Sequence, residues 1–130
     1  MTAIEYLRMH ADITSALGVL HDQLAEYRAA CDTLRSQDGD RLTFEEACAE
    51  YADFTVICSQ ISDVLNARRA SIRQTVRQLP QPYQSIIMLR YIRGYSWAQI
   101  SASTKYSRQH VHRLHGHALQ LIDNLLKTNA

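Results

Sequence analysis

Apolar side chains recur every three or four residues along most of this 130-residue chain, which is the spacing of one face of an α-helix. In the first half these positions form two series: Leu17, Leu20, Leu24, Tyr27, Cys31 and Leu34, then Phe44, Ala47, Tyr51, Phe54, Cys58, Ile61 and Leu65. The chain has only four glycines and two prolines, too few turn residues for many short strands. The sequence therefore predicts an all-α fold.

A polar break separates the two series. The segment 36–40 reads Ser-Gln-Asp-Gly-Asp, a composition typical of a turn. Just after it, Thr43 is predicted to cap the second helix, with Glu46 completing a capping box and Leu42 packing on Ala47. Two long helices joined by a short polar loop are expected to form a long antiparallel helical hairpin.

Charge divides the chain into two halves. Residues 1–66 contain twelve Asp and Glu against four arginines, whereas residues 67–130 contain ten Lys and Arg against one acid, Asp123. A basic half with almost no acids favours a polyanionic partner, usually nucleic acid. The segment 66–71 interrupts the second apolar series at this boundary and is either a joint or a continuous stretch of helix. We predict an acidic helical hairpin over residues 1–70 and a basic nucleic-acid-binding domain over residues 71–130.

The hairpin alone leaves apolar flanks such as Val56, Ile57 and Val64 uncovered. We expect the acidic part to self-associate as a coiled coil. The residues predicted for this oligomerisation are Leu17, Leu20, Leu24, Tyr51, Phe54 and Ile61. The alternative is a hairpin within one chain, whose acids form a solvated face.

Break and cap signals divide the basic half into short helices. The run 79–82 contains both prolines, and Pro82 suits the first turn of a new helix. Ser96 and Gln99 predict a capping box for a short helix, and Ser107 is predicted to cap the last helix. The inner face of that last helix is predicted to be Val111, Leu114, Ala118, Leu121, Ile122 and Leu125. A short helix, a three-residue turn and a longer helix form a helix-turn-helix motif.

Three positions depart from the usual pattern of this motif. Ser101 stands where alanine is common, Thr104 where leucine is common, and Lys105 where glycine usually takes a positive φ. A non-glycine residue in that conformation costs on the order of 1 kcal/mol, unless the turn differs slightly. The anchors predicted to fix the two helices at a steep angle are Ile100, Tyr106, Val111 and Leu114.

The basic half resembles region 4 of bacterial sigma factors between about residues 72 and 126. The residues that carry the resemblance are Leu79-Pro80, Leu89-Arg90-Tyr91, Gly94, Ser96, Ile100, Ser107, Val111, Arg113-Leu114 and Ala118-Leu119. The chain looks closer still to the ArpU-type, sigma-like regulators of Gram-positive phages. This resemblance implies a helix-turn-helix that reads duplex DNA and activates late genes. The promoter-melting region 2 of a complete sigma factor has no counterpart in these residues.

The resemblance also indicates which side chains contact DNA. The positions that match the base-reading part of the recognition helix are Arg108, Gln109, His112 and Arg113. Arginine can bind guanine through two hydrogen bonds, and glutamine can bind adenine in the same way. The residues expected at DNA phosphates are Arg93, Ser96, Lys105, Ser107 and His110. Gly116 permits either close approach to a phosphate or packing against another helix, and Arg90 either contacts phosphate or fixes the fold through an internal carboxylate.

Neither the cysteines nor the histidines have the spacing of a metal site. Cys31, Cys48 and Cys58 fall within the helical pattern and are expected to act as small buried apolar side chains. The clustered histidines are His110, His112, His115 and His117. Because zinc normally needs three or four convergent ligands, we predict no metal. Phosphate-binding glycine loops and nucleophile motifs are lacking too, so the sequence predicts no cofactor, no catalytic residue and no enzymatic activity.

These observations predict a sequence-specific, double-stranded-DNA-binding transcription regulator, encoded by a phage or prophage and active on late genes. Its expected partners are DNA, further copies of itself in a homodimer or higher homo-oligomer, and host RNA polymerase. No run is apolar enough to span a membrane, and we expect a cytoplasmic protein in the bacterial host. Two alternatives remain. One is the DNA-recognition subunit of a phage small terminase, and the other is a sigma-like module that binds polymerase or another protein without reading DNA.

Overall fold

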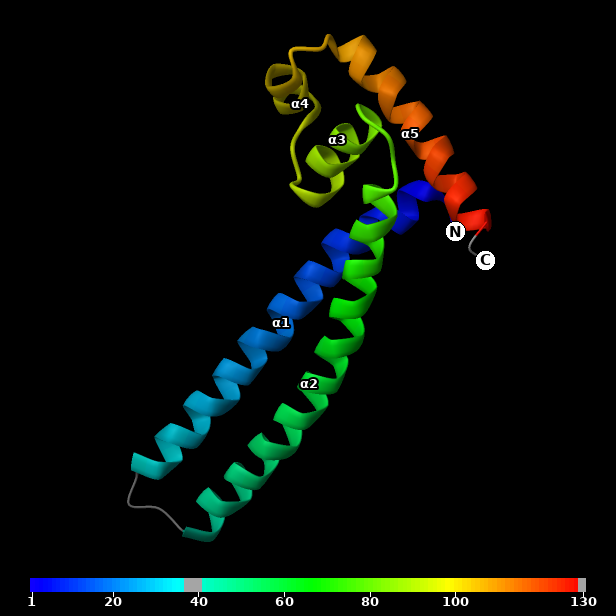
Figure 1. Ribbon diagram of the computed structural model, residues 1–130. Helices are drawn as coiled ribbons and strands as arrows, with labels where there is room; N and C mark the ends of the chain where they lie inside the picture. The colour runs from blue at the N-terminus through cyan, green and yellow to red at the C-terminus, as the bar shows by residue number, and fades with distance from the viewer. Residues whose placement is uncertain (37–40, 129–130) are drawn as a thin grey trace. The chain divides into compact units, whose positions relative to one another are not determined.

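The computed structural model describes residues 1–36 and 41–128, and every element within those ranges is a helix (Figure 1). The elements are α1 (Ala3–Ser36), α2 (Arg41–Arg77), α3 (Tyr83–Ile87), the π-helical segment η1 (Met88–Ile92), α4 (Trp97–Thr104) and α5 (Arg108–Thr128). The predicted all-α class is therefore confirmed. Of the turn predicted over 36–40, Ser36 belongs to α1 and residues 37–40 lie outside the described residues.

The chain divides into two compact units whose boundary passes through both long helices. One unit comprises Ile13–Ala67, and the other comprises Met1–Asp12 together with Arg68–Ala130. The sequence predicts a single division at residues 70–71, whereas in the structure the first twelve residues group with the basic half. Helix α2 runs through the segment 66–71, so the change of charge occurs within a continuous helix.

In the unit Ile13–Ala67, α1 and α2 lie side by side as two antiparallel helices (Figure 1). The rings of Tyr27 and Phe54 stack with their centroids 5.0 Å apart. The Cys31 thiol donates to the Ala47 carbonyl oxygen at 3.4 Å. Burial raises the pKa of the Cys31 thiol, so it stays protonated. The long helices therefore pair within one chain.

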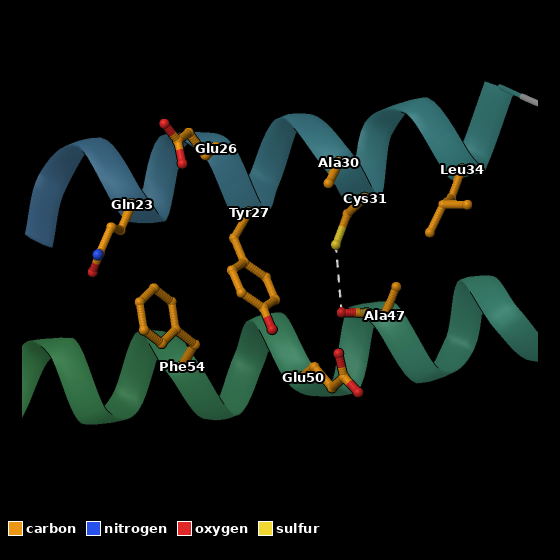
Figure 2. A pocket seen from close by; sticks show the side chains of 9 residues that line it. All are labelled: Gln23, Glu26, Tyr27, Ala30, Cys31, Leu34, Ala47, Glu50 and Phe54. Atoms are coloured by element: carbon orange, nitrogen blue, oxygen red, sulfur yellow. Dashed lines mark hydrogen bonds between the residues drawn. The ribbon is translucent and has the colours of Figure 1, made fainter.

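An open groove of about 590 Å³ lies between these two helices near Ala30 and Ala47 (Figure 2). Figure 2 shows Tyr27 reaching from α1 toward α2 and Phe54 reaching from α2 toward α1. The two alanines are too small to fill the space beside these rings, which explains the groove.

The side chains predicted for oligomerisation divide into two sets. Leu17, Leu20, Leu24, Tyr51 and Phe54 are half-buried. Ile61 is 42% exposed, and Val56, Ile57 and Val64 are more exposed still. Ile57, Ile61 and Val64 of this exposed set follow steps of four and three residues, which place them on one side of α2, and Val56 is next to Ile57 in sequence. Pairing within the chain therefore leaves this apolar stripe uncovered.

The beginning of α2 differs from the prediction. The helix starts at Arg41, so Thr43 lies inside its first turn and cannot be the residue that caps it. The capping box predicted for Thr43 and Glu46 was therefore wrong. Arginine and leucine at positions 41 and 42 are good helix formers, which is consistent with the earlier start. The side chain of Leu42, predicted to pack on Ala47, lies outside the described residues.

The second unit has a core built from three helices. Ile86 of α3, Ile100 of α4, and Val111 and Leu114 of α5 form one buried cluster. Tyr83, Leu89, Tyr95 and Trp97 pack against it. The predicted anchor Tyr106 is not part of this core: it is 37% exposed, and its ring meets the His110 ring edge-on at 4.8 Å. The anchor prediction therefore holds for three residues and was wrong for Tyr106.

The first three turns of α1 complete this unit. The Ala3 amide donates to Asp123 Oδ1 at 2.9 Å, and the Tyr6 hydroxyl bonds the Thr75 hydroxyl at 2.9 Å. Arg73 Nε donates to His10 Nε2 at 3.1 Å. Burial and the neighbouring charges of Arg73 and Arg69 lower the pKa of His10, so this ring is held neutral.

Among the described helices, none combines the length and the apolar character that crossing a membrane requires.

Candidate nucleic-acid interface

Helix α4 begins with the capping box that the sequence predicts. The Ser96 hydroxyl accepts from the Gln99 amide at 3.2 Å, and the Gln99 side chain accepts from the Ser96 amide at 2.8 Å. Two amides that have no partner within the helix are thus satisfied reciprocally. This box fixes the direction in which α4 leaves the preceding loop.

The turn between α4 and α5 is held by the three residues that depart from the usual pattern. Lys105 adopts the left-handed conformation, with φ of 64°. The Thr104 hydroxyl donates to the Ile100 carbonyl at 2.7 Å, and the Ser101 hydroxyl donates to the Tyr106 carbonyl at 2.6 Å. The turn therefore keeps the left-handed geometry that glycine usually supplies, and two side-chain hydroxyls brace it.

Helix α5 starts directly after this turn. The Ser107 hydroxyl accepts from the His110 amide at 3.1 Å, which confirms Ser107 as the cap. Val111, Leu114, Ala118 and Ile122 are the buried residues of the helix, whereas Leu121 and Leu125, predicted for the same face, are half-buried. The apolar stripe packs against the core, so the opposite face of the first turns is directed outward.

The four predicted base-reading residues lie on this outward face. Arg108, Gln109, His112 and Arg113 are all exposed. Within the part of the chain that the structure describes, the side chains of Arg108, Gln109 and Arg113 make no hydrogen bond or ion pair. Positive charge and side-chain donors at the start of a helix add to the partial positive charge of the helix terminus.

Trp97, the first residue of α4, supports part of this surface. Its ring centroid lies 4.7 Å from the rings of both His112 and His115. The Arg90 guanidinium lies 4.4 Å from the Trp97 ring centroid, and Arg90 Nη1 donates to the Tyr95 carbonyl at 3.0 Å. Arg90 thus fixes the fold, as one of its two interpretations proposes, but its acceptor is a backbone carbonyl and not the carboxylate that we expected.

His115 is half-buried and contacts Tyr91 in two ways. Its Nε2 bonds the Tyr91 hydroxyl at 2.8 Å, and its ring stacks on Tyr91 with centroids 5.8 Å apart. Burial, then the neighbouring His112 and Arg90, lower the pKa of His115. Burial also raises the pKa of Tyr91. Both groups of the pair are therefore neutral, and the pair connects η1 to α5.

The residues expected at DNA phosphates lie in the segments before α4 and α5 and in the first turn of α5. Arg93 and Lys105 are exposed at the two turns that precede α4 and α5. The hydroxyl oxygens of Ser96 and Ser107 accept cap hydrogen bonds, which leaves each hydroxyl hydrogen able to donate to a phosphate. The fifth residue, His110, is half-buried against Tyr106.

The clustered histidines pack on aromatic rings, and His112 and His115 share the ring of Trp97. His110 contacts Tyr106, His112 contacts Trp97, and the His117 ring lies 6.3 Å from Tyr83. In the described ranges, no three His, Cys, Asp or Glu side chains form a group that could hold a metal ion. The sequence reasoning missed the support that Trp97 and Tyr91 give to α5. The available signal was the three-residue spacing of His112 and His115, which places both on one side of the helix.

Gly116 lies in the third turn of α5, on the same outward side. A Cβ added there would meet no atom of the described protein within 4 Å. Helix packing, one of the two interpretations of this glycine, is therefore not its role within the described chain. A shallow hollow of about 260 Å³ is present over this position.

Comparison with known proteins identifies this part of the chain. Residues 75–122 match the family model described as Sigma-70, region 4. No curated protein and no solved structure matches the chain. The matched residues include α3, η1, α4, the turn at Lys105 and most of α5. Residues 75–122 are therefore similar to sigma-70 region 4, a helix-turn-helix family of the DNA-binding regulator type.

Proposed function

We propose that this protein is a sequence-specific regulator of transcription that binds double-stranded DNA through the first turns of α5. The observation that carries the proposal is the outward row of Arg108, Gln109, His112 and Arg113, opposite the buried Val111 and Leu114. A helix with this arrangement can place its N-terminal side chains against base edges in the major groove while its apolar face stays on the core.

Each base-reading side chain has a distinct task in this proposal. Arg108 and Arg113 bind guanine O6 and N7, and Gln109 binds adenine N6 and N7. His112 contacts a neighbouring base edge, and its ring is oriented by Trp97. Arg93, Ser96, Lys105, Ser107 and His110 bind phosphates and set the register of α5 on the duplex.

We propose that the unit Ile13–Ala67 joins subunits. Support comes from the exposed stripe of Val56, Ile57, Ile61 and Val64 on α2, which pairing within the chain leaves uncovered. A homodimer or higher homo-oligomer would recognise repeated half-sites spaced by whole turns of the duplex. The resemblance to ArpU-type regulators supports a role on late phage genes in the bacterial cytoplasm, in contact with host RNA polymerase.

Selection of bound duplexes from a random pool, followed by footprinting of the enriched sequence, tests this function. We expect one enriched motif, protection in the major groove, and affinity that falls steeply as salt increases, because phosphate binding releases counterions. Recovery of unselected sequences, or binding that salt does not weaken, would contradict the proposal.

A further inference from the structure

The hollow over the third turn of α5 is lined only by residues suited to an anion. The residues that line it are Gly116, His112, Arg113, His117 and Gln120. Each of these four side chains carries at least one N–H donor, and no carboxylate belongs to the lining. Charged and neutral N–H donors around a small polar space are the groups that bind phosphate oxygens.

The fold itself gives no reason for glycine at this position. Gly116 is exposed, and a Cβ there would meet nothing within 4 Å in the described protein. Glycine in a helix interior is destabilising relative to alanine because it has more backbone freedom to lose. The absence of a side chain thus leaves room for a group outside the described chain.

The position of Gly116 along the helix identifies that group. With a rise of 1.5 Å per residue, Gly116 lies about 12 Å beyond Arg108 along the axis of α5. The major groove is about 8.5 Å deep. When the N-terminal residues of a recognition helix contact base edges, its later turns can contact the sugar–phosphate backbone that borders the groove.

We propose that this hollow seats one phosphodiester group of the DNA backbone, which approaches α5 through the space that a Cβ at position 116 would fill. His117 and Gln120 donate to its oxygens, while Arg113 remains directed to a base. The inference rests on the proposed DNA-binding function and adds a phosphate site to it. Because the phosphate group is chemically the same at every nucleotide, this contact is independent of base sequence.

Two glycines of the chain allow a matched test. Gly116→Ala and Gly116→Leu fill the hollow, and Gly18→Ala and Gly18→Leu make the same changes in α1, where a Cβ also meets nothing within 4 Å. All four variants replace glycine by a better helix former, so each should raise the Tm. On a random-sequence duplex at low salt, the Gly116 variants should lose about tenfold or more in affinity, the loss typical of a charge-assisted hydrogen bond, and the Gly18 variants should bind as the wild type does.

The outcomes separate this inference from the proposed function. If the wild-type protein shows no salt-sensitive duplex binding, the proposed function fails. If the wild type binds, Arg113→Ala weakens binding, and the Gly116 variants bind like the wild type, the phosphate site is absent and the function stands. A loss confined to the selected duplex and missing on random duplexes would place a base, not a phosphate, over Gly116 and would overturn the inference.

Single methylphosphonate substitutions along the selected duplex locate the seated phosphate. At one position, removal of the phosphate charge should lower the affinity of the wild-type protein for the duplex but have little further effect on the affinity of Gly116→Leu. If the substitution at every position lowers the duplex affinity of both proteins equally, no phosphate occupies the hollow and the inference is wrong.

Discussion

The Trp97 ring centroid lies 4.7 Å from that of His112, so the first residue of α4 supports a side chain on the outward face of α5. Arg90 lies over the same indole and bonds the Tyr95 carbonyl. The segment before α4, α4 itself and α5 are therefore connected through one aromatic ring.

Replacement of Trp97 should affect both stability and DNA binding. Trp97→Leu removes the ring contacts with Arg90, His112 and His115 and should lower the free energy of unfolding by about 1–3 kcal/mol. Trp97→Phe retains an aromatic ring and should lower the free energy of unfolding by less. A double-mutant cycle of Trp97→Leu with His112→Ala should show a coupling of ~0.5–1.5 kcal/mol in DNA affinity. Strict additivity would show that the indole does not orient His112 in the complex.

Lys105 combines an unfavourable backbone conformation with an exposed charge. Lys105→Gly should raise the free energy of unfolding by about 1 kcal/mol, because glycine adopts a positive φ without a steric penalty. Lys105→Ala keeps the penalty and serves as the matched control. Both variants remove the same charge, so each should weaken binding to all duplexes and reduce the salt slope by ~0.9. Equal stability of the two variants in thermal unfolding would contradict the left-handed turn.

Acid should destabilise the unit that contains α5. The pKa values of His10 and His115 lie below the ordinary value of 6.5, so the folded protein binds fewer protons than the unfolded chain. Stability from this source is present above pH 6.5 and falls as the pH drops toward the folded-state values. The Tm should therefore fall between about pH 7.5 and about pH 5.5. The Tm of the double variant His10→Gln, His115→Gln should fall less over the same pH interval. If its Tm depends on pH as that of the wild type does, this explanation is wrong.

Charge on the exposed stripe of α2 should separate subunits. Val64 is 68% exposed, and Ile57 is 51% exposed, so lysine at both positions should leave the fold intact. The double variant should change the mass in light scattering from an oligomer to a monomer. Val19→Lys, at an exposed valine of α1, is the control and should keep the oligomer. If the double variant has the same mass as the wild-type protein, this stripe is not the subunit interface.

Features that depend on nearby residues could be predicted from the sequence. The caps at Ser96 and Ser107 bond amides three residues away, and the buried face of α5 follows from helical spacing. The positive φ of Lys105 was accessible through its place in the motif. Local patterns were sufficient because the interactions that hold these elements are themselves local.

Features that depend on distant residues could not be predicted in this way. Ala3 bonds Asp123, and Tyr6 bonds Thr75, across separations that helical periodicity does not encode. The support of His112 by Trp97 likewise needs the packing of two helices. Tyr106 has the apolar character of an anchor, but its ring turns to His110 at the surface.

In the proposed function, α5 reads bases with one set of side chains while Lys105 binds the phosphate backbone of the DNA. The most direct measurement compares the affinities of Arg113→Ala and Lys105→Ala for the selected duplex and for a random duplex. Arg113→Ala should cost ~1–3 kcal/mol on the selected duplex and relax base preference at one position, whereas Lys105→Ala should weaken both duplexes about equally. If both variants lose the same affinity on both duplexes, Arg113 does not read a base and the account is wrong.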